Sequence, residues 1–281
     1  MSRYLASLPL FFLSLFITPL FAWNALGHMI VAQIAYENLK PDVRVKVDDL
    51  VHHFTEEYPE MKYFQQLSYW PDTLRSQRIE TFTRWHYIDV AFSKDGTATK
   101  EKIDTDNAAW AIKNLVAIVP YERANVYERA RFLAFLIHIV GDLHQPLHTV
   151  TYFSAEHPEG DRGGNAYMIR YNNQRVKLHS LWDSGIENFK SDPNLSNAAW
   201  FSNIITQHYP KSFFGAKAYS FNAEVWVKEG MDNARTHVYN TPENQGASSA
   251  YIENAKKIAE QQVALAGYRL AGLLNYLFTP R

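Results

Sequence analysis

Histidine and aspartate are concentrated in an apolar setting near the middle of the chain. The segment "RFLAFLI" (131–137) reads as the interior of a helix, and "HIVGDLHQPLH" (138–148) follows it directly. His138 and Asp142 stand four residues apart, a spacing that places both side chains on one face of a helix. Because buried imidazole and carboxylate groups are costly without partners, the segment predicts either a buried network of hydrogen bonds with a structural role or a metal site.

The same H-x-x-x-D spacing recurs at His179 and Asp183. Such a pair can also be an ordinary ion pair on a helix face, so the surrounding residues must decide between the two interpretations. Further imidazole and carboxylate groups stand among aromatic and apolar residues, where solvated side chains are not expected: His28, Asp72, His86 and His148. One four-coordinate zinc cannot use all of these donors, whereas two or three ions can. His144 is a candidate for orienting a ligand.

The N-terminal stretch "MSRYLASLPLFFLSLFITPLFAW" reads as a secretory signal peptide. Arg3 supplies the positive start, the segment 8–16 is almost entirely apolar, and Ala22 is a plausible cleavage residue. We therefore expect a signal peptide at 1–22, one domain at 23–281, and a secreted or periplasmic product without stable membrane association. An uncleaved anchor is the alternative, because the apolar stretch approaches the length that spans a bilayer.

Cleavage after Ala22 would add two metal donors at the start of the mature chain. A free α-amino group has a reference pKa of about 7.7–8.0 and can lose its proton to a metal. The Trp23 carbonyl is close enough to chelate with that amine, and His28 follows in "WNALGH". The alternative is that Trp23 only anchors the N-terminus in the core.

Composition limits the remaining possibilities. The 28 basic and 29 acidic residues are balanced and form no basic stripe, which argues against tight sequence-independent binding to duplex phosphates. There is no cysteine, so disulfides, thiolate metal sites and cysteine nucleophiles are excluded. The 281 residues and the hydrophobic content of 47% suit one large domain.

The elements that position these residues are mostly helices with apolar residues at helical spacing. Helices are predicted at 26–40, 42–54, 107–119, 126–144, 178–189 and 248–278. Asp106 is expected to cap the third helix, and Asn125 with Glu128 forms a capping box at the fourth. "AYMIRYNNQRVKL" (166–178) predicts a β-hairpin that turns at Asn172-Asn173. The fold class is therefore all-α, a single mainly helical domain with a small hairpin.

Six motifs make a family resemblance specific. "WNALGH", "WPDTLR", "WHYIDV", "HIVGDLHQPLH", "GDRGGN" and "LHSLWD" occur in this order, and the chain resembles the S1/P1 nuclease family over residues 23–183. The resemblance implies the helical fold shared with zinc-dependent phospholipase C. It also implies hydrolysis of single-stranded RNA and DNA to 5′-mononucleotides, in many members with 3′-nucleotidase activity. The lack of cysteine suggests a bacterial member, since eukaryotic members often carry disulfides.

The resemblance also implies three zinc ions per chain. The first would be bound by Asp72, His86, His138 and Asp142. The second would be bound by His148, His179 and Asp183. The third would take the amine and carbonyl of Trp23 together with His28, and would share Asp142 with the first.

Substrate residues follow from the same motifs. Arg75 resembles the family arginine that holds a phosphate oxygen, although a structural ion pair is an alternative role. Tyr87 matches an aromatic residue that stacks on the base, and Asp89 and Asn165 match polar residues of the same cleft, so Arg75, Asp89 and Asn165 are expected to act in catalysis. Strict strand alternation would place His86 on the face opposite Tyr87 and Asp89, so we expect an irregular segment there.

Two other functions remain open from the sequence. A zinc-dependent phospholipase C would share the fold, but it typically has glutamate where Asp183 stands. A secreted zinc-binding protein without turnover would not need Arg75, Tyr87 or Asp89.

Overall fold

The computed structural model describes residues 23–100 and 103–279, so the predicted signal peptide at 1–22 lies outside the described residues. The α-helices are α1 (Ala25–Glu37), α2 (Pro41–Glu57), α3 (Phe64–Leu67), α4 (Trp70–Ser76), α5 (Ala108–Ile118), α6 (Val126–Asp142), α7 (Leu178–Asp183), α8 (Leu195–His208), α9 (Ala223–Asn233) and α10 (Ser249–Phe278). Shorter helical segments are η1 (Thr83–His86), η2 (Pro146–Thr149), η3 (Lys211–Tyr219) and the π-helical η4 (Ala234–Val238). The strands are β1 (Val90–Ser93), β2 (Val150–Phe153), β3 (Met168–Tyr171) and β4 (Gln174–Lys177).

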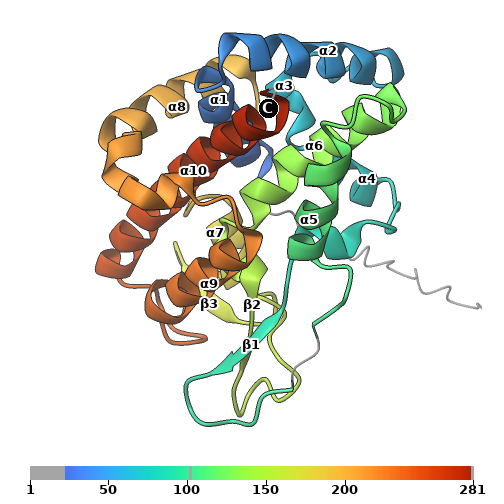
Figure 1. The fold of residues 1–281 in the computed structure, drawn as a ribbon. Coiled ribbons are helices and arrows are strands. Elements are labelled where there is room, and N and C mark those ends of the chain that lie inside the picture. The colour runs from blue at the N-terminus through green and yellow to red at the C-terminus, as the bar shows by residue number, and fades with distance from the viewer. Residues whose placement is uncertain (1–22, 101–102, 280–281) are drawn as a thin grey trace, which may run out of the picture.

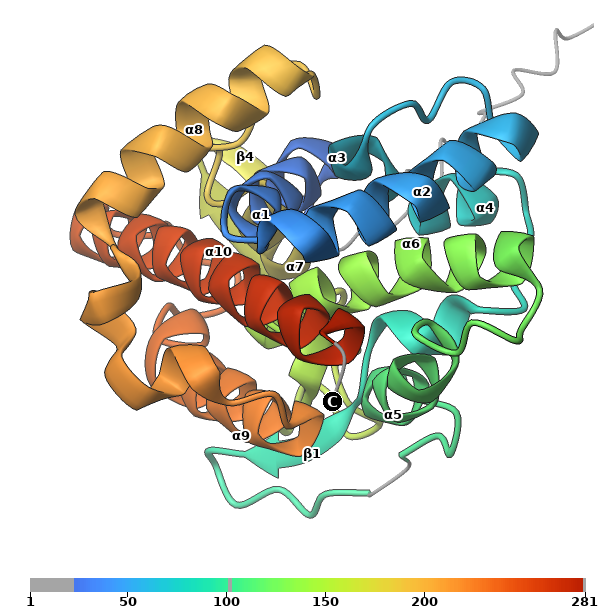
Figure 2. The same ribbon diagram turned by 45° about the horizontal axis from the view of Figure 1, so that its top comes forward.

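The long helix α10 runs through the middle of the helical body (Figures 1 and 2). Helices α1 and α2 lie on one side of it and α9 on the other, with α8 and α6 flanking it. Buried side chains of α1, α2, α5, α6 and α10 form one hydrophobic core. The predicted all-α class with a small hairpin is therefore confirmed. Within the described ranges, no helix is both long and apolar enough to cross a membrane.

Five of the six predicted helices are found with small differences at their ends, but the helix predicted at 178–189 is wrong in its second half. It ends at Asp183 as α7, and the residues at 185–187 have positive φ values. Helix α6 ends at Asp142, two residues before the expected end at His144. Asp106 does not cap α5, so that prediction was wrong: its carboxylate lies 3.4 Å from Arg84 instead. Asn107 caps α5 because its side chain accepts a hydrogen bond from the Trp110 amide at 3.0 Å.

The hairpin prediction is confirmed by the antiparallel pairing of β3 with β4. Asn172 and Asn173 have φ values of 49° and 62°, as a tight two-residue hairpin turn requires. A second pair, β1 with β2, is parallel and was not predicted. Its strands are four residues long and lie far apart in the sequence, so neither carries a local signal. The Ile88 amide extends this pairing by donating to the His148 carbonyl at 2.8 Å.

Candidate metal centre and adjoining cleft

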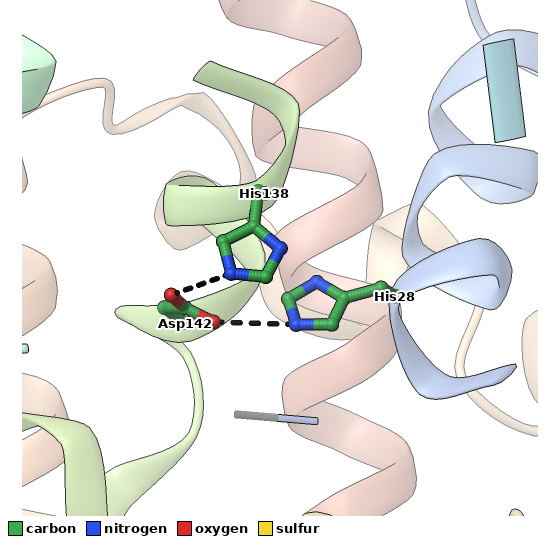
Figure 3. A group of neighbouring side chains, drawn as sticks. All are labelled: His28, His138 and Asp142. Atoms are coloured by element: carbon green, nitrogen blue, oxygen red, sulfur yellow. Dashed lines mark ion pairs between the residues drawn. The ribbon is translucent and has the colours of Figure 1, made fainter. Parts of the chain in front are cut away.

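The first cluster of possible ligands joins α1 to the C-terminal end of α6. Figure 3 shows the His28 and His138 imidazoles converging on the Asp142 carboxylate. The His28 Nε2 to Asp142 Oδ1 distance is 3.3 Å, and the His138 Nε2 to Asp142 Oδ2 distance is 3.2 Å. The two rings stack with centroids 4.0 Å apart. Gly141 permits this approach, because a Cβ there would lie 2.9 Å from the His28 ring.

The second cluster shares His138 with the first and adds residues from α4 and η1. Asp72 Oδ1 lies 3.7 Å from both His86 Nε2 and His138 Nε2. The segment after His86 is irregular, as predicted, because Tyr87 is extended and β1 begins at Val90. The two imidazoles and the carboxylate are close enough to bind one ion.

The third cluster lies between η2 and α7. His179 Nε2 is 3.4 Å from Asp183 Oδ2, and His148 Nε2 is 3.9 Å from Asp183 Oδ1. The H-x-x-x-D spacing of α7 thus brings both side chains to one face, as expected. All eight predicted side-chain ligands therefore fall into three buried groups: His28, His138, Asp142; Asp72, His86, His138; and His148, His179, Asp183.

Backbone carbonyls fix the orientation of four imidazoles through the Nδ1 atom. The acceptors are Ser68 O for His138 at 2.7 Å, His86 O for His148 at 2.7 Å, Gly163 O for His179 at 2.5 Å, and Phe82 O for His86 at 3.1 Å. An Nδ1 that donates a proton leaves Nε2 as the free lone pair. Each of these rings therefore presents a metal-binding nitrogen to its cluster.

The buried polar atoms of the clusters fit a set of bound cations. Several have no hydrogen-bond partner in the described chain: both ring nitrogens of His28, Nε2 of His86, His138 and His148, and both carboxylate oxygens of Asp72 and Asp142. Within the clusters, the imidazole nitrogen and carboxylate oxygen atoms lie 3.2–3.9 Å apart. Neighbouring ligand atoms of a tetrahedral zinc ion are separated by about 3.3 Å, which is close to these values. The set contains nitrogen and oxygen donors, which zinc accepts.

Burial keeps three imidazoles of the clusters neutral, which is the form that binds a metal ion. It lowers the pKa of His28 to about 4, and of His86 and His179 to about 3, so these rings are neutral near pH 7. Burial raises the pKa of Asp72 to about 7 and that of Asp183 well above its usual range. His138 and Arg75 oppose the rise at Asp72, and Arg75 opposes it at Asp183, but only partly, and a bound cation would favour the ionised form of both carboxylates.

Trp23 is buried next to the first cluster. Its indole Nε1 donates to Gly141 O at 3.0 Å, beside Asp142. The following residue, Asn24, donates its amide proton to Asp183 O at 2.8 Å and caps α1 by accepting from the Gly27 amide. The start of the described chain is therefore fixed against both α6 and α7. The expected roles of the Trp23 amine and carbonyl as ligands stay a prediction.

A cleft of about 250 Å³ opens beside the third cluster. We call it the Tyr87 cleft, and its lining residues are Arg75, Thr83, Tyr87, Asp89, Leu147, His148, Arg162, Asn165 and His179. All four substrate residues expected from the sequence thus meet two possible metal ligands in one cavity. Burial, with Asp161 and Asp104 nearby, raises the pKa of Asp89 to about 6. The Asn165 Oδ1 atom is buried without a hydrogen-bond partner, although its amide nitrogen donates to Arg162 O.

The loop "GDRGGN" forms one wall of the Tyr87 cleft. Asp161 holds the loop by accepting from the Tyr152 amide at 2.9 Å, the Gly164 amide at 2.9 Å and the Tyr239 hydroxyl at 2.6 Å. Gly163 has φ of 59°, and a Cβ there would lie 2.3 Å from the Leu147 carbonyl oxygen. The loop exposes Arg162 to the cleft. No role was assigned to this arginine from the sequence, although its place between Asp161 and Gly163 in a quoted motif was a usable signal.

Two residues of "HQPLH" lie next to the metal ligands in the sequence without belonging to a cluster. Gln145 donates from Nε2 to Asp183 Oδ1 at 2.6 Å and accepts from the Leu147 amide at 2.7 Å. His144, the candidate for orienting a ligand, instead contacts the buried guanidinium of Arg269 at 3.0 Å and so links the end of α6 to α10. The orienting group that sequence reasoning missed is therefore the adjacent glutamine.

Comparison with known proteins extends this description. Nuclease S1 of Aspergillus oryzae is 25% identical over 281 residues, covering 92% of each chain. Nuclease P1 of Penicillium citrinum is 23% identical, covering 90% of this chain and 97% of the relative. Endonuclease 2 of Arabidopsis thaliana is 26% identical, covering 91% of this chain and 90% of the relative. A crystal structure of Clostridium perfringens alpha-toxin aligns with 18% identity and a TM-score of 0.43, covering 88% of this chain and 62% of the toxin.

A family model described as S1/P1 Nuclease matches residues 23–279. The match begins at Trp23, includes every residue of the three clusters and the Tyr87 cleft, and continues through the helices after Phe189. With this match across nearly the whole chain, the protein belongs to the S1/P1 nuclease family.

Proposed function

We propose that the protein is a zinc-dependent phosphodiesterase that hydrolyses single-stranded RNA and DNA to 5′-mononucleotides and also removes 3′-phosphates from nucleotides. The observation that carries the proposal is the lining of the Tyr87 cleft. There the imidazoles of His148 and His179 lie in the same wall as a guanidinium, an aromatic ring and a carboxylate. These groups match the parts of a nucleotide, namely its phosphate, the face of its base and the edge of its base.

The proposed metal content is three zinc ions. Asp72, His86, His138 and Asp142 would hold the first, and His148, His179 and Asp183 the second. The third would bind the amine and carbonyl of Trp23, His28 and the second oxygen of Asp142. The unpartnered oxygens of Asp142, each facing a different imidazole, support its role as a shared ligand.

The chain's own groups would hold the substrate for in-line attack by water. Arg75 would donate hydrogen bonds to a non-bridging phosphate oxygen and limit rotation of the phosphate. Tyr87 would stack on the base, while Asp89 and Asn165 would bind its polar edge. Bound zinc supplies Lewis acidity toward phosphate oxygens and activates water near neutral pH.

The shape of the Tyr87 cleft favours single strands. Its volume of about 250 Å³ suits one base that has left the stack, and Tyr87 is only partly exposed at its wall. A base inside a duplex must lose its pairing and stacking before it can enter, which costs a few kcal/mol. Duplexes should therefore be poor substrates.

Export belongs to the same proposal. Residues 1–22 would be removed as a signal peptide, giving a secreted or periplasmic enzyme whose first residue is Trp23. The family match that starts at Trp23 supports this boundary. The burial of Trp23 against α6 also supports it, since the first residue would then lie beside Asp142.

One assay separates this function from the alternatives. Purified protein beginning at Trp23 is offered single-stranded DNA, RNA, a 3′-nucleotide and phosphatidylcholine, with and without EDTA. We expect EDTA-sensitive release of 5′-mononucleotides and of phosphate from the 3′-nucleotide. Cleavage of phosphatidylcholine in place of nucleic acid would indicate a phospholipase, and zinc binding without turnover would indicate a storage protein.

A further inference from the structure

A second cavity, of about 550 Å³, opens against the metal centre and has no part in the proposed function so far. We call it the Tyr69 cavity, and it is lined on one side by Asp72 and by Ser184, the residue after Asp183. The Tyr87 cleft is lined instead by Arg75 and His179. Helix α4 thus contributes residues to both cavities, whereas α7 contributes His179 to the Tyr87 cleft and is followed by Ser184 in the Tyr69 cavity. Asp72 lines the Tyr69 cavity and stands on the same short helix as Arg75, which lines the Tyr87 cleft.

Helix geometry explains why α4 can separate the two cavities. Successive residues on an α-helix are about 100° apart around the axis. Relative to Asp72, this places Thr73 and Ser76 on one side of the helix and Arg75 on the other. The contacts agree, since Thr73 and Ser76 line the Tyr69 cavity and Arg75 lines the Tyr87 cleft. A phosphate beside Asp72 would therefore have one cavity on each side.

The walls of the Tyr69 cavity have the chemistry of a nucleoside site. Tyr69 and Leu26 supply apolar surface, and Lys190 stands exposed at the edge. The hydroxyls of Thr73 and Ser76 donate to backbone carbonyls of α4, so their oxygens remain available as acceptors. The volume falls within the range of about 300–1,000 Å³ that is typical of small-molecule sites.

A phosphodiester has a nucleoside on each side, and the Tyr87 cleft accounts for one of them. We propose that the Tyr69 cavity binds the second nucleoside, the one joined to the scissile phosphate through its 5′-oxygen, with Tyr69 as the stacking surface. This inference rests on the proposed function. Water forms the new bond to phosphorus, the bond from phosphorus to the 3′-oxygen breaks, and that oxygen takes up a proton. The nucleoside in the Tyr87 cleft leaves with a 3′-hydroxyl, and the 5′-mononucleotide remains in the Tyr69 cavity.

The test compares two diesters that differ only in the second nucleoside. Zinc-loaded protein beginning at Trp23 is given d(ApA) or 2′-deoxyadenosine 3′-(methyl phosphate), and kcat/KM is measured for each. We expect Tyr69→Ala to lower kcat/KM for d(ApA) about tenfold, the size of a lost stacking contact, and to leave the methyl ester unchanged. Tyr69→Phe keeps the ring and should restore cleavage of d(ApA).

A matched control and a binding measurement separate stacking from structural damage. Tyr209 is also a partly buried tyrosine packed against the main core, and it lines neither cavity, so Tyr209→Ala should leave the ratio of the two kcat/KM values unchanged. A methylphosphonate-linked d(ApA), which resists hydrolysis, should bind more weakly to Tyr69→Ala in calorimetry. Elemental analysis should give the same zinc content for every variant.

The outcomes distinguish failure of this inference from failure of the proposed function. Equal loss of both activities in Tyr69→Ala, or equal kcat/KM for the two diesters with the wild-type enzyme, would overturn the assignment of the Tyr69 cavity. A wild-type enzyme that cleaves neither diester would instead contradict the proposed phosphodiesterase.

Discussion

Two H-x-x-x-D pairs share one spacing but lie in different electrostatic surroundings. Burial would raise the pKa of Asp142, but His138 and His28 beside it hold that pKa well below its usual range. Burial raises the pKa of Asp183 well above its usual range, and the Gln145 hydrogen bond opposes this only partly. The spacing alone thus does not determine the charge of a carboxylate. Asp142 lies between the imidazoles of His28 and His138, and we propose that it is shared between two zinc sites, whereas Asp183 serves one.

Removal of each carboxylate tests this difference most strongly. Asp142→Ala should lose more than one zinc, because it removes a ligand from two sites, whereas Asp183→Ala should lose one. Activity should fall about a thousandfold or more in both, since metal-ion catalysis is worth several kcal/mol. Elemental analysis of the two purified variants gives the answer. A loss of one zinc in both would contradict the shared role of Asp142.

A change at the N-terminus tests the zinc site that Asp142 is proposed to share with Trp23 and His28. A chain with one or two extra residues ahead of Trp23 has an amide nitrogen there, which is a poor donor because its lone pair is delocalised. We expect this form to fold, to bind one zinc fewer than the chain that begins at Trp23, and to cut single strands far more slowly. Equal zinc content and activity in the two forms would remove Trp23 from the site.

A substitution of Gln145 tests only the proposed zinc site of His148, His179 and Asp183. Gln145→Ala removes the donor to Asp183 Oδ1 and should weaken zinc binding at that site by about 10- to 100-fold, with the Asp142 sites unaffected. A chelator titration that resolves the individual zinc ions measures the effect. Gln65→Ala is the control, because this buried glutamine bonds to Gln33 rather than to a possible ligand. Uniform weakening of all sites would show that Gln145 acts on the fold.

The smallest effects are expected where no ligand is touched. Tyr87→Ala and Asp89→Ala should each reduce cleavage of single strands by an amount corresponding to about 1–3 kcal/mol, the value of a base contact. Zinc content should not change, because neither residue belongs to a cluster. Wild-type activity in both variants would mean that the base is bound elsewhere.

Sequence reasoning succeeded where a pattern is local. The periodicity of α6 and α10, the Asn172-Asn173 turn and the two H-x-x-x-D pairs all lie within short windows. The motifs then supplied residues that periodicity could not, such as Asp89 and Asn165, which lie far apart in the chain and line one cleft. The parallel β1–β2 pair escaped prediction because each strand depends on a distant partner for its hydrogen bonds.

The missed residues of the site share a physical reason. The role of Gln145 depends on Asp183, 38 positions away, and that of Arg162 depends on a left-handed backbone with φ of 57°. The contact between His144 and Arg269 spans 125 positions. A single sequence contains no measure of such distances, so these contacts became visible only in three dimensions.

The hydrogen bond from the Asn24 amide to the Asp183 carbonyl has a consequence for the order of folding. It joins residues that lie 159 positions apart in the sequence, and the possible ligands of the three clusters are spread over nearly the same span. Closing so long a loop costs entropy that local helices do not have to overcome. We therefore expect the helices to form early and the ligand clusters to assemble late, after α7 has been synthesised. A chain arrested before residue 178 should be helical yet unable to retain its full complement of metal.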